Sequence, residues 1–203
     1  MTIQNALEFS EAIRKHQAAF ELGLSDKQIA KLDDYYNFVL ENNEFLHLVA
    51  PCSAEEFAVR HILESLMALH YMTDDSSFVD IGAGAGLPSI PCLLVRETLR
   101  GRLIDSKQKK TKFLKEAVEK FGIGNRVTVL NKQFREARKP DVSFVLCRAL
   151  DKFSQNLPSI LSWSKNASVL LFAGNNIREV LNDKGVKFEE KLIPMSEQRF
   201  IFL

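Results

Sequence analysis

One short stretch, Phe78–Pro91, constrains the fold of this chain more than any other. It reads FVDIGAGAGLPSIP, so an apolar run leads into a turn in which glycine alternates with alanine, followed by a segment compatible with a helix. The glycines Gly82, Gly84 and Gly86 can adopt positive φ angles and let a ligand lie against the backbone. The stretch therefore predicts a strand, a tight turn and a helix whose first amide groups point at a bound ligand.

The spacing of these glycines favours one kind of ligand. A dinucleotide-binding turn has the pattern G-x-G-x-x-G, whereas this turn has G-x-G-x-G and carries an acid, Asp80, two residues before its first glycine. A carboxylate beside the turn disfavours a pyrophosphate and suits a cationic ligand without phosphate. S-adenosylmethionine fits this description, because its methionyl ammonium and its sulfonium are both positive. The alternative is an ordinary glycine-rich turn between a strand and a helix.

A second acid points to a nucleoside. Arg102–Asp105 reads as the next strand, and Asp105 ends it roughly 20 residues beyond the glycine turn, where a doubly wound sheet binds ribose hydroxyls. Asp105 is therefore a candidate for binding ribose. The alternative is a helix N-cap, since Asp105 and Ser106 precede a helix expected to begin near Lys107, and one carboxylate could serve both purposes.

The overall charge excludes a strong general attraction to polyanions. The 203 residues include 27 Lys or Arg and 26 Asp or Glu, which gives a net charge of +1, so contact with RNA must come from local patches. The apolar fraction of 46% supports a sizeable core for one α/β domain with an extra helical element. The chain shows no signal segment and no apolar run of membrane-spanning length, which predicts a cytoplasmic protein.

The cysteines and histidines indicate neither a disulfide framework nor a metal site. Cys52, Cys92 and Cys147 lie in apolar surroundings without C-x-x-C spacing, and their odd number favours buried, reduced thiols. The histidines show no ligand spacing with cysteines or carboxylates, so we expect no metal.

Hydrophobic periodicity divides the chain into an N-terminal helical extension, residues 1–72, and an α/β domain, residues 73–203, which we expect to pack as one compact unit. Helices are expected in the first part over Ile3–Glu21, Asp26–Glu41 and Ser53–Leu69. Ser53 and Glu56 are spaced as a capping box. The second of these helices carries an apolar stripe typical of core, formed by Ile29, Leu32, Tyr36, Val39 and Leu40.

From Phe78 onward, strands and helices alternate. We expect strands near Phe78–Ile81, Gly101–Asp105, Arg126–Leu130, Val142–Cys147, Ser168–Phe172, Val186–Lys191 and Gln198–Leu203. Helices are expected over Pro88–Arg96, Lys107–Phe121, Phe153–Trp163 and Asn176–Asp183. This alternation predicts a seven-stranded, mostly parallel sheet covered on both faces and ending in an antiparallel hairpin.

Two further residues are candidates for function. Arg148 follows the apolar run of the fourth predicted strand and should reach the cleft beyond the carboxyl ends of the strands. It could pair with a carboxylate, bind a phosphate or stack on a base, and a structural ion pair is equally compatible with its position. His61 lies on the third predicted helix, where position alone is more typical of a structural residue than of a catalyst.

Basic residues concentrate near one rim of the predicted sheet. They lie on the helix that begins near Lys107 and in the loop after the third strand: Lys107, Lys109, Lys110, Lys112, Lys115, Arg135, Arg138 and Lys139. Such a group could track a phosphate backbone, although a solvated helix face would have the same composition.

Four segments of the chain together resemble the small-subunit ribosomal RNA methyltransferase G family, also known as glucose-inhibited division protein B. They are RHILES from Arg60, DIGAGAGLPSIP from Asp80, Asp105-Ser106 with Lys110 and Phe113-Leu114, and Cys147-Arg148-Ala149. The similarity runs from about Asn43 to the carboxyl end in the same order, and Gly-Leu-Pro-x-Ile-Pro is its most specific part.

This resemblance implies a Rossmann-like, class I S-adenosylmethionine-dependent methyltransferase. The implied reaction transfers a methyl group to N7 of a guanine in the 530 loop of 16S ribosomal RNA, with S-adenosylhomocysteine as product and 16S RNA or the 30S subunit as partner. The implied catalytic residues are Arg148 and His61. The residues expected to bind the cofactor are Asp80, Gly82, Ala83, Gly84, Gly86, Leu87, Asp105, Ser106, Phe134, Arg135 and Arg148.

The chemistry needs positioning more than acid-base catalysis, because guanine N7 has an in-plane lone pair that requires no deprotonation. Arg148 would orient the base or its phosphate.

The chain also departs from the family pattern. His47-Leu48-Val49 replaces Asn-Leu-Thr, Glu64 replaces an aspartate, Arg135 replaces an acid unless Glu136 takes over its role, and Ala173-Gly174 replaces a lysine-glycine pair. Two alternatives therefore stay open: a cofactor-binding but weak or inactive ribosome-associated protein, and a methyltransferase with another RNA or a small substrate.

Overall fold

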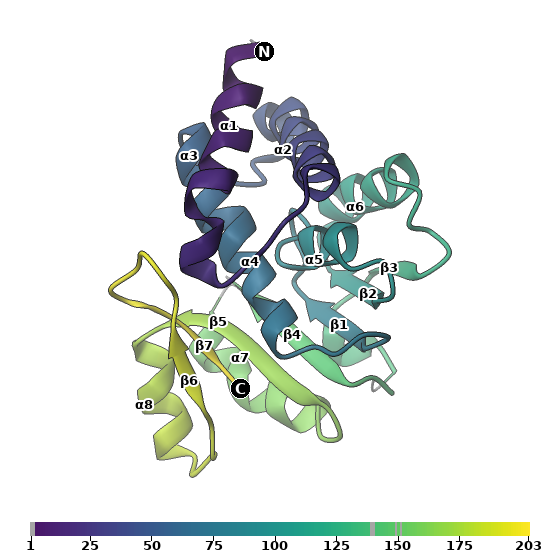
Figure 1. The fold of residues 1–203 in the computed structure, drawn as a ribbon. Coiled ribbons are helices and arrows are strands. Elements are labelled where there is room, and N and C mark those ends of the chain that lie inside the picture. The colour runs from purple at the N-terminus through teal and green to yellow at the C-terminus, as the bar shows by residue number, and fades with distance from the viewer. Residues whose placement is uncertain (1–2, 139–140, 149, 151) are drawn as a thin grey trace.

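The sheet lies at the centre of the structure, a computed structural model that describes residues 3–138, 141–148, 150 and 152–203. Its strands are β1 (Ser77–Ile81), β2 (Arg100–Asp105), β3 (Val127–Asn131), β4 (Phe144–Arg148), β5 (Ser168–Gly174), β6 (Glu190–Leu192) and β7 (Arg199–Phe202). They form a 7-stranded sheet in the order β3-β2-β1-β4-β5-β7-β6 (Figure 1). The first five pair in parallel and β7 runs antiparallel to β5 and β6. The predicted sheet is therefore confirmed.

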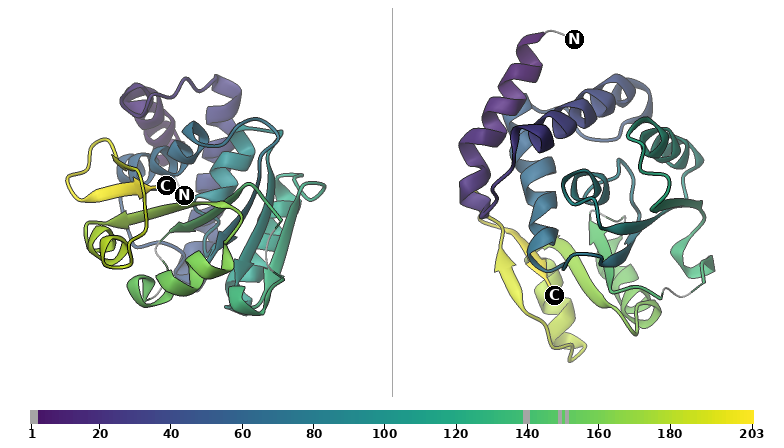
Figure 2. Two further views of the ribbon diagram at one scale, coloured as in Figure 1. Left: turned by 90° about the horizontal axis from the view of Figure 1, so that it is seen from below. Right: turned by 45° about the vertical axis from the view of Figure 1, so that its right-hand side comes forward.

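Residues of the central strands alternate between two cores, because each strand is buried on both faces. In β1, Phe78 belongs to one core and Val79 to the other, and in β2 Leu103 and Ile104 divide in the same way. The first core includes α5 (Ser89–Val95) and α6 (Gln108–Lys120). The second includes α7 (Phe153–Trp163) and α8 (Asn176–Asp183). Helices thus cover both faces of the sheet, as Figure 2 shows.

The turn after β1 lies where the order of the strands reverses. β1 pairs with β2 on one side and with β4 on the other, in the registers Ile81↔Ile104 and Ile81↔Cys147. Connections to the two sides diverge at such a point and leave a crevice beyond the carboxyl ends of the strands. The fold therefore places the glycine turn in the position where doubly wound proteins bind their ligands.

The N-terminal helices contribute to the first core, and the second of them packs against α5 and α6. They are α1 (Ile3–His16), the 3₁₀ turn η1 (Gln17–Phe20) and α2 (Asp26–Leu46). Helix α2 begins at a capping box, in which Ser25 accepts a hydrogen bond from the Gln28 amide and Gln28 accepts one from the Ser25 amide. It continues past the predicted end at Glu41 and stops where His47 adopts a φ of 47°. Five of its side chains are buried: Ile29, Leu32, Tyr35, Tyr36 and Val39.

The segment predicted as one helix over Ser53–Leu69 is divided in the structure. It consists of α3 (Ala54–Glu56), a π-helix η2 (Phe57–Leu63), α4 (Glu64–Leu66) and a 3₁₀ turn η3 (Met67–His70). Ser53 caps its start by accepting from the Glu56 amide at 3.1 Å. The predicted capping box is wrong in its second half, because the Glu56 carboxylate pairs with Arg60 four residues on. Single π turns inside helices are frequent at functional sites.

The cysteines are free, as predicted; Cys92 and Cys147 are buried, while Cys52 is only partly buried. Within the described ranges, no helix combines the length and the apolar character that a membrane span needs.

Candidate active site

Two cavities open beyond the carboxyl ends of the strands. The first has a volume of about 240 Å³ and is lined by the ends of β1 and β2, the start of α6 and the loop after β3. The second has a volume of about 530 Å³ and lies between the glycine turn, the π-helix and the ends of β4, β5 and β7. Gly82 and Lys110 line both, so the two cavities meet at the glycine turn.

The turn has the glycine-dependent geometry that the sequence predicts. Gly82, at a φ of +72°, forms the wall between the cavities, and a Cβ there would lie 2.6 Å from Leu150. Gly86 has a φ of +86°, and a Cβ on it would lie 2.7 Å from Ile90. Neither position admits an L side chain without strain. Gly86 packs against α5 and is not among the described residues that line the cavities, whereas Gly84 lines the second.

Asp105 holds the turn in place. Its Oδ2 accepts a hydrogen bond from the Gly84 amide at 2.9 Å, and its Oδ1 accepts one from the Lys107 amide at 2.8 Å. The carboxylate is only 7% exposed but lines the first cavity. An ionised carboxylate offers about four acceptor positions, so capacity remains for hydroxyl groups in that cavity.

The N-cap alternative for this stretch is wrong. Helix α6 begins at Gln108, and its N-cap is Lys107, which makes no side-chain capping hydrogen bond in the described structure. Asp105 instead bridges the end of β2 and the glycine turn, because the turn brings an unpaired amide within reach. Ser106 is exposed and lines the first cavity beside it.

Asp80 lies beneath the turn. It is 1% exposed and is not among the described residues that line either cavity. Ser89 donates a hydrogen bond to its Oδ2, and its Oδ1 has no partner within the described residues. Burial raises the pKa of Asp80 to about 7, so the carboxyl is partly protonated near neutral pH. Direct contact of Asp80 with a ligand stays a prediction.

The wall of the first cavity opposite the turn is aromatic. Phe134 lines it and packs edge-on against Trp163, with the ring centroids 5.7 Å apart. The Arg135 guanidinium lies 5.1 Å from the centroid of Phe134 and donates to Asn156 Oδ1 at 2.8 Å. Glu136 accepts from the Gln133 amide within the same turn. Glu136 is not among the described residues that line this cavity. It therefore does not take over the role of the acid that Arg135 replaces.

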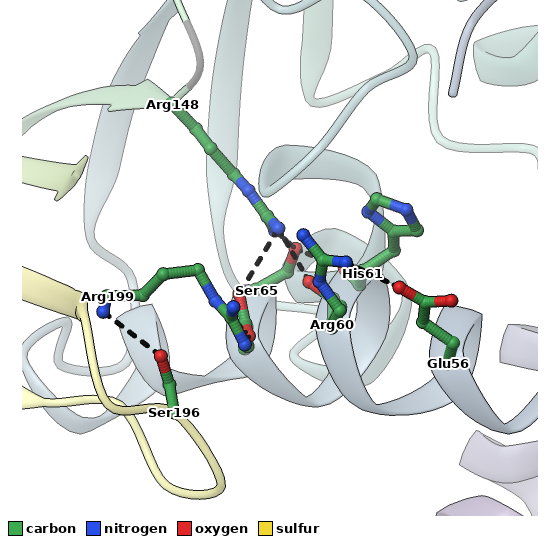
Figure 3. Close-up of polar contacts among 8 residues, drawn as sticks. Glu56, Arg60, His61, Ser65, Arg148, Ser196 and Arg199 are labelled. Atoms are coloured by element: carbon green, nitrogen blue, oxygen red, sulfur yellow. Dashed lines mark hydrogen bonds and ion pairs between the residues drawn. The ribbon is translucent and has the colours of Figure 1, made fainter. Parts of the chain in front are cut away.

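Arg148 enters the second cavity from the end of β4 and meets the π-helix segment (Figure 3). It donates to Ser65 Oγ at 2.9 Å and to the Arg60 carbonyl oxygen at 2.5 Å. It also pairs with Glu64 at 3.3 Å, and its side chain is 14% exposed. The ion pair considered from the sequence is therefore present, and it holds the guanidinium at the cavity wall.

Glu64 joins two arginines that are distant in sequence. Its side chain is 2% exposed, and its Oε1 accepts from Arg199 on β7 at 2.7 Å while its Oε2 faces Arg148. Arg199 is paired in register with Gly174 at the end of β5. It therefore brings a cation to the cavity that Ala173, the position where the family pattern has lysine, also lines. Sequence reasoning missed this contact, because nothing local in β7 indicates its partner.

The second cavity is strongly basic. Among the residues that the structure describes, four cations line it against one carboxylate, that of Glu64: Arg60, Lys110, Arg148 and Arg199. Such a cavity suits an anionic substrate, because unlike charges attract strongly at a wall that is only partly hydrated.

His61 lines the second cavity from the π-helix, with its ring edge-on to Phe57 at 4.9 Å. Burial, and to a smaller extent the charges of Arg148, Arg60 and Arg199, together lower the pKa of His61 to about 4. The imidazole is therefore neutral at pH 7. It can donate or accept a hydrogen bond but cannot act as an acid there.

Some of the remaining predicted positions line the second cavity, and others do not. Ala83 and Leu87 line the second cavity with Leu48 and Val49, and the Asn43 side chain bonds both the amide and the carbonyl of Val49. His47 ends helix α2 and is exposed. Ala149 and Lys139, named with the family pattern and the basic group, lie outside the described residues.

Comparisons with known proteins agree with this geometry. A family model described as rRNA small subunit methyltransferase G matches residues 28–192. The protein of that name from Lactobacillus acidophilus is 30% identical over 223 residues, covering 98% of this chain and 90% of that protein. The Lactococcus lactis subsp. lactis protein is 30% identical, covering 91% and 85%. The Pelotomaculum thermopropionicum protein is 34% identical over 116 residues, covering 56% and 48%.

Solved structures show the same fold. A SAM-dependent methyltransferase from Aquifex aeolicus superposes with a TM-score of 0.58 at 17% identity, covering 72% of this chain and 90% of that chain. TrmK from M. capricolum, in complex with S-adenosyl-homocysteine, gives 0.53 at 18% identity, covering 68% and 65%. These likenesses confirm the class I methyltransferase fold.

Replacement of Gly86 is expected to disturb the turn more than replacement of a glycine with the same backbone conformation elsewhere. Gly122 has a φ of +63° and nothing within 4 Å of a built Cβ, so Gly122→Ala should cost only the strain of a left-handed residue, about 1–2 kcal/mol. Gly86→Ala should add overpacking against Ile90, for a total of about 2–5 kcal/mol. Urea unfolding of both variants measures the loss in the free energy of unfolding. Equal losses in the two variants would contradict the packing role of Gly86.

The buried carboxyl of Asp80 should make stability depend on pH. Because its folded pKa is raised from 3.8 to about 7, the protonated form is favoured in the fold, and stability is lost as pH rises through that window. Asp80→Asn mimics the protonated form and should gain on the order of 2–4 kcal/mol over the wild type between pH 5 and pH 8. Urea unfolding at both pH values checks this; a difference that does not change with pH would exclude the raised pKa.

Proposed function

The chain belongs to the rRNA small subunit methyltransferase G family, and we propose on this basis that it methylates N7 of a guanine in the 530 loop of 16S ribosomal RNA. S-adenosylmethionine is its cofactor and S-adenosylhomocysteine its product. The observation that carries the proposal is the pair of cavities that meet at Gly82, one bordered by Asp105 and the other by Arg148 and Arg199. The first suits a nucleoside and the second a segment of RNA.

The residues present fit the cofactor. We place its adenosine in the first cavity, where Asp105 has acceptor capacity for the ribose hydroxyls and Phe134 offers an apolar ring to the adenine. The methionyl end then passes Gly82 into the second cavity, where the turn presents backbone at Gly84 and Ala85. When bound, S-adenosylmethionine supplies an electrophilic methyl group on its sulfonium.

The chain's own residues would act by positioning. Guanine N7 already presents a lone pair, so the protein must hold the base in line with the methyl group and exclude water. Arg148 is fixed by Ser65, Glu64 and the Arg60 carbonyl, and from there it would orient the flipped guanine or its phosphate. His61 is neutral and would contribute a hydrogen bond rather than a proton transfer.

The departures from the family pattern leave the basic cavity intact. Ala173 removes a cation from β5, but Arg199 on the neighbouring strand lines the same cavity and is oriented by Glu64. The engagement of Arg148 by three acceptors is nonetheless the one observation that favours the second candidate, a cofactor-binding but inactive ribosome-associated protein.

We further propose that residues 1–72 form a helical extension of the methyltransferase domain at 73–203, packed with it as one unit. The partner would be naked 16S RNA or the assembled 30S subunit in the cytoplasm.

Mapping of N7-methylguanine in 16S RNA, from cells with and without this protein, tests the proposed reaction. The 530-loop guanine should carry the modification only when the protein is present. Purified protein with labelled S-adenosylmethionine should methylate 30S subunits or naked 16S RNA. Cofactor binding by calorimetry without transfer to either RNA would favour the inactive alternative, and no cofactor binding would exclude both.

The pH profile of methyl transfer should show no role for His61 as a base. Because the pKa of His61 is lowered to about 4, nearly all of its imidazole is neutral above about pH 6. The pH profile of kcat should therefore show no limb near the usual pKa of histidine. His61→Asn should therefore change the magnitude of kcat but leave the shape of its profile between pH 6 and pH 8. A limb near pH 6.5 that disappears in His61→Asn would contradict this assignment.

A further inference from the structure

A tyrosine of the N-terminal helices reaches the glycine turn from below. Tyr35 lies in the middle of α2 and is fully buried, and its hydroxyl donates a hydrogen bond to the Ala85 carbonyl oxygen at 2.6 Å. Its ring is edge-on to Phe121 at the end of α6, with centroids 6.1 Å apart. Burial raises the pKa of Tyr35, so the hydroxyl remains protonated and acts as the donor.

The hydrogen bonds of the turn alternate along its peptides. In the peptide between Ala83 and Gly84, the carbonyl accepts from the Gly86 amide and the N–H donates to Asp105. In the peptide between Ala85 and Gly86, the carbonyl accepts from Tyr35 and the N–H donates to Ala83. Both polar ends of these two peptides are therefore fixed.

The peptide between them is different. Neither the Gly84 carbonyl nor the Ala85 amide has a hydrogen-bond partner among the residues that the structure describes. Both residues are buried and both line the second cavity. Buried backbone groups are almost always paired, so this peptide has the character of a preformed contact for a ligand. Asp105 fixes its near side and Tyr35 its far side.

We propose that Tyr35 is a positioning residue for the cofactor: it orients the Gly84–Ala85 peptide toward the methionyl end of S-adenosylmethionine. This inference rests on the proposed function, and it gives the N-terminal helices a part in cofactor binding. Tyr35 touches no reacting atom and acts only through the turn.

A matched pair of variants separates positioning from general stability. Tyr35→Phe removes only the hydroxyl. Tyr36→Phe makes the same change at the next residue, a buried ring that stacks on Phe9 with centroids 4.5 Å apart and does not contact the turn through a hydrogen bond in the described structure.

Calorimetry with two ligands gives the decisive comparison. Tyr35→Phe loses one hydrogen bond that fixes a ligand-binding peptide. Its affinity for S-adenosylmethionine should therefore fall about three- to tenfold. The affinity for 5′-methylthioadenosine, which lacks the amino-acid chain of the cofactor, should change less than about twofold. Tyr36→Phe should bind both ligands as the wild type does. An equal loss of affinity for both ligands in Tyr35→Phe, or no change in either affinity, would overturn the proposal.

Amide hydrogen exchange without any ligand gives a second readout. In Tyr35→Phe the Gly86 amide should exchange faster, because its peptide has lost a fixed carbonyl, while the Ala83 amide, bonded to Ile104 at 3.1 Å, should keep its protection. Unchanged protection of Gly86 would overturn the proposal. Failure of the wild-type protein to bind S-adenosylmethionine would instead overturn the proposed function itself, and this inference with it.

Discussion

The hydrogen bond from the Gly84 amide to Asp105 is the interaction on which the site depends. It joins the turn after β1 to the end of β2, and the 2.9 Å contact fixes a backbone that three positive-φ glycines would otherwise leave free. A hydrogen bond to a charged acceptor contributes about 1.5–3 kcal/mol. The same carboxylate borders the first cavity, so the group that orders the turn is also the group we assign to the ribose.

Both cavities are lined by more basic than acidic side chains among the described residues, and the carboxylate at each has a different task. Asp105 orders the glycine turn beside the first cavity, and Glu64 lies between two arginines of the second. Glu64 limits the mutual repulsion of Arg148 and Arg199 by accepting from both. The ribose hydroxyls can therefore lie against Asp105 while the anionic RNA occupies the space beside Arg148 and Arg199, and Gly82 is the boundary between the two cavities.

Features set by local sequence were predictable, and features set by distant contacts were not. The glycine turn and the strands up to β5 were predicted because apolar runs and glycine spacing are local signals, whereas the strand expected over Val186–Lys191 is only the short β6 over Glu190–Leu192. The bond from Tyr35 to Ala85 spans 50 residues and that from Arg199 to Glu64 spans 135, so neither left a signal in the sequence. The N-cap interpretation of Asp105 was wrong for a related reason: its Oδ2 accepts from the distant Gly84 amide, and its Oδ1 accepts from the amide of Lys107, which is itself the N-cap of α6. The π-helix was likewise hidden within a pattern compatible with an ordinary helix.

A crystal structure with S-adenosylhomocysteine bound tests the central claim most directly. The account predicts ribose hydroxyls within hydrogen-bonding distance of the Asp105 carboxylate, adenine beside Phe134, and the amino-acid end beyond Gly82 in the basic cavity. A ligand that binds elsewhere, or one that enters only after the turn has left its contact with Asp105, would contradict it.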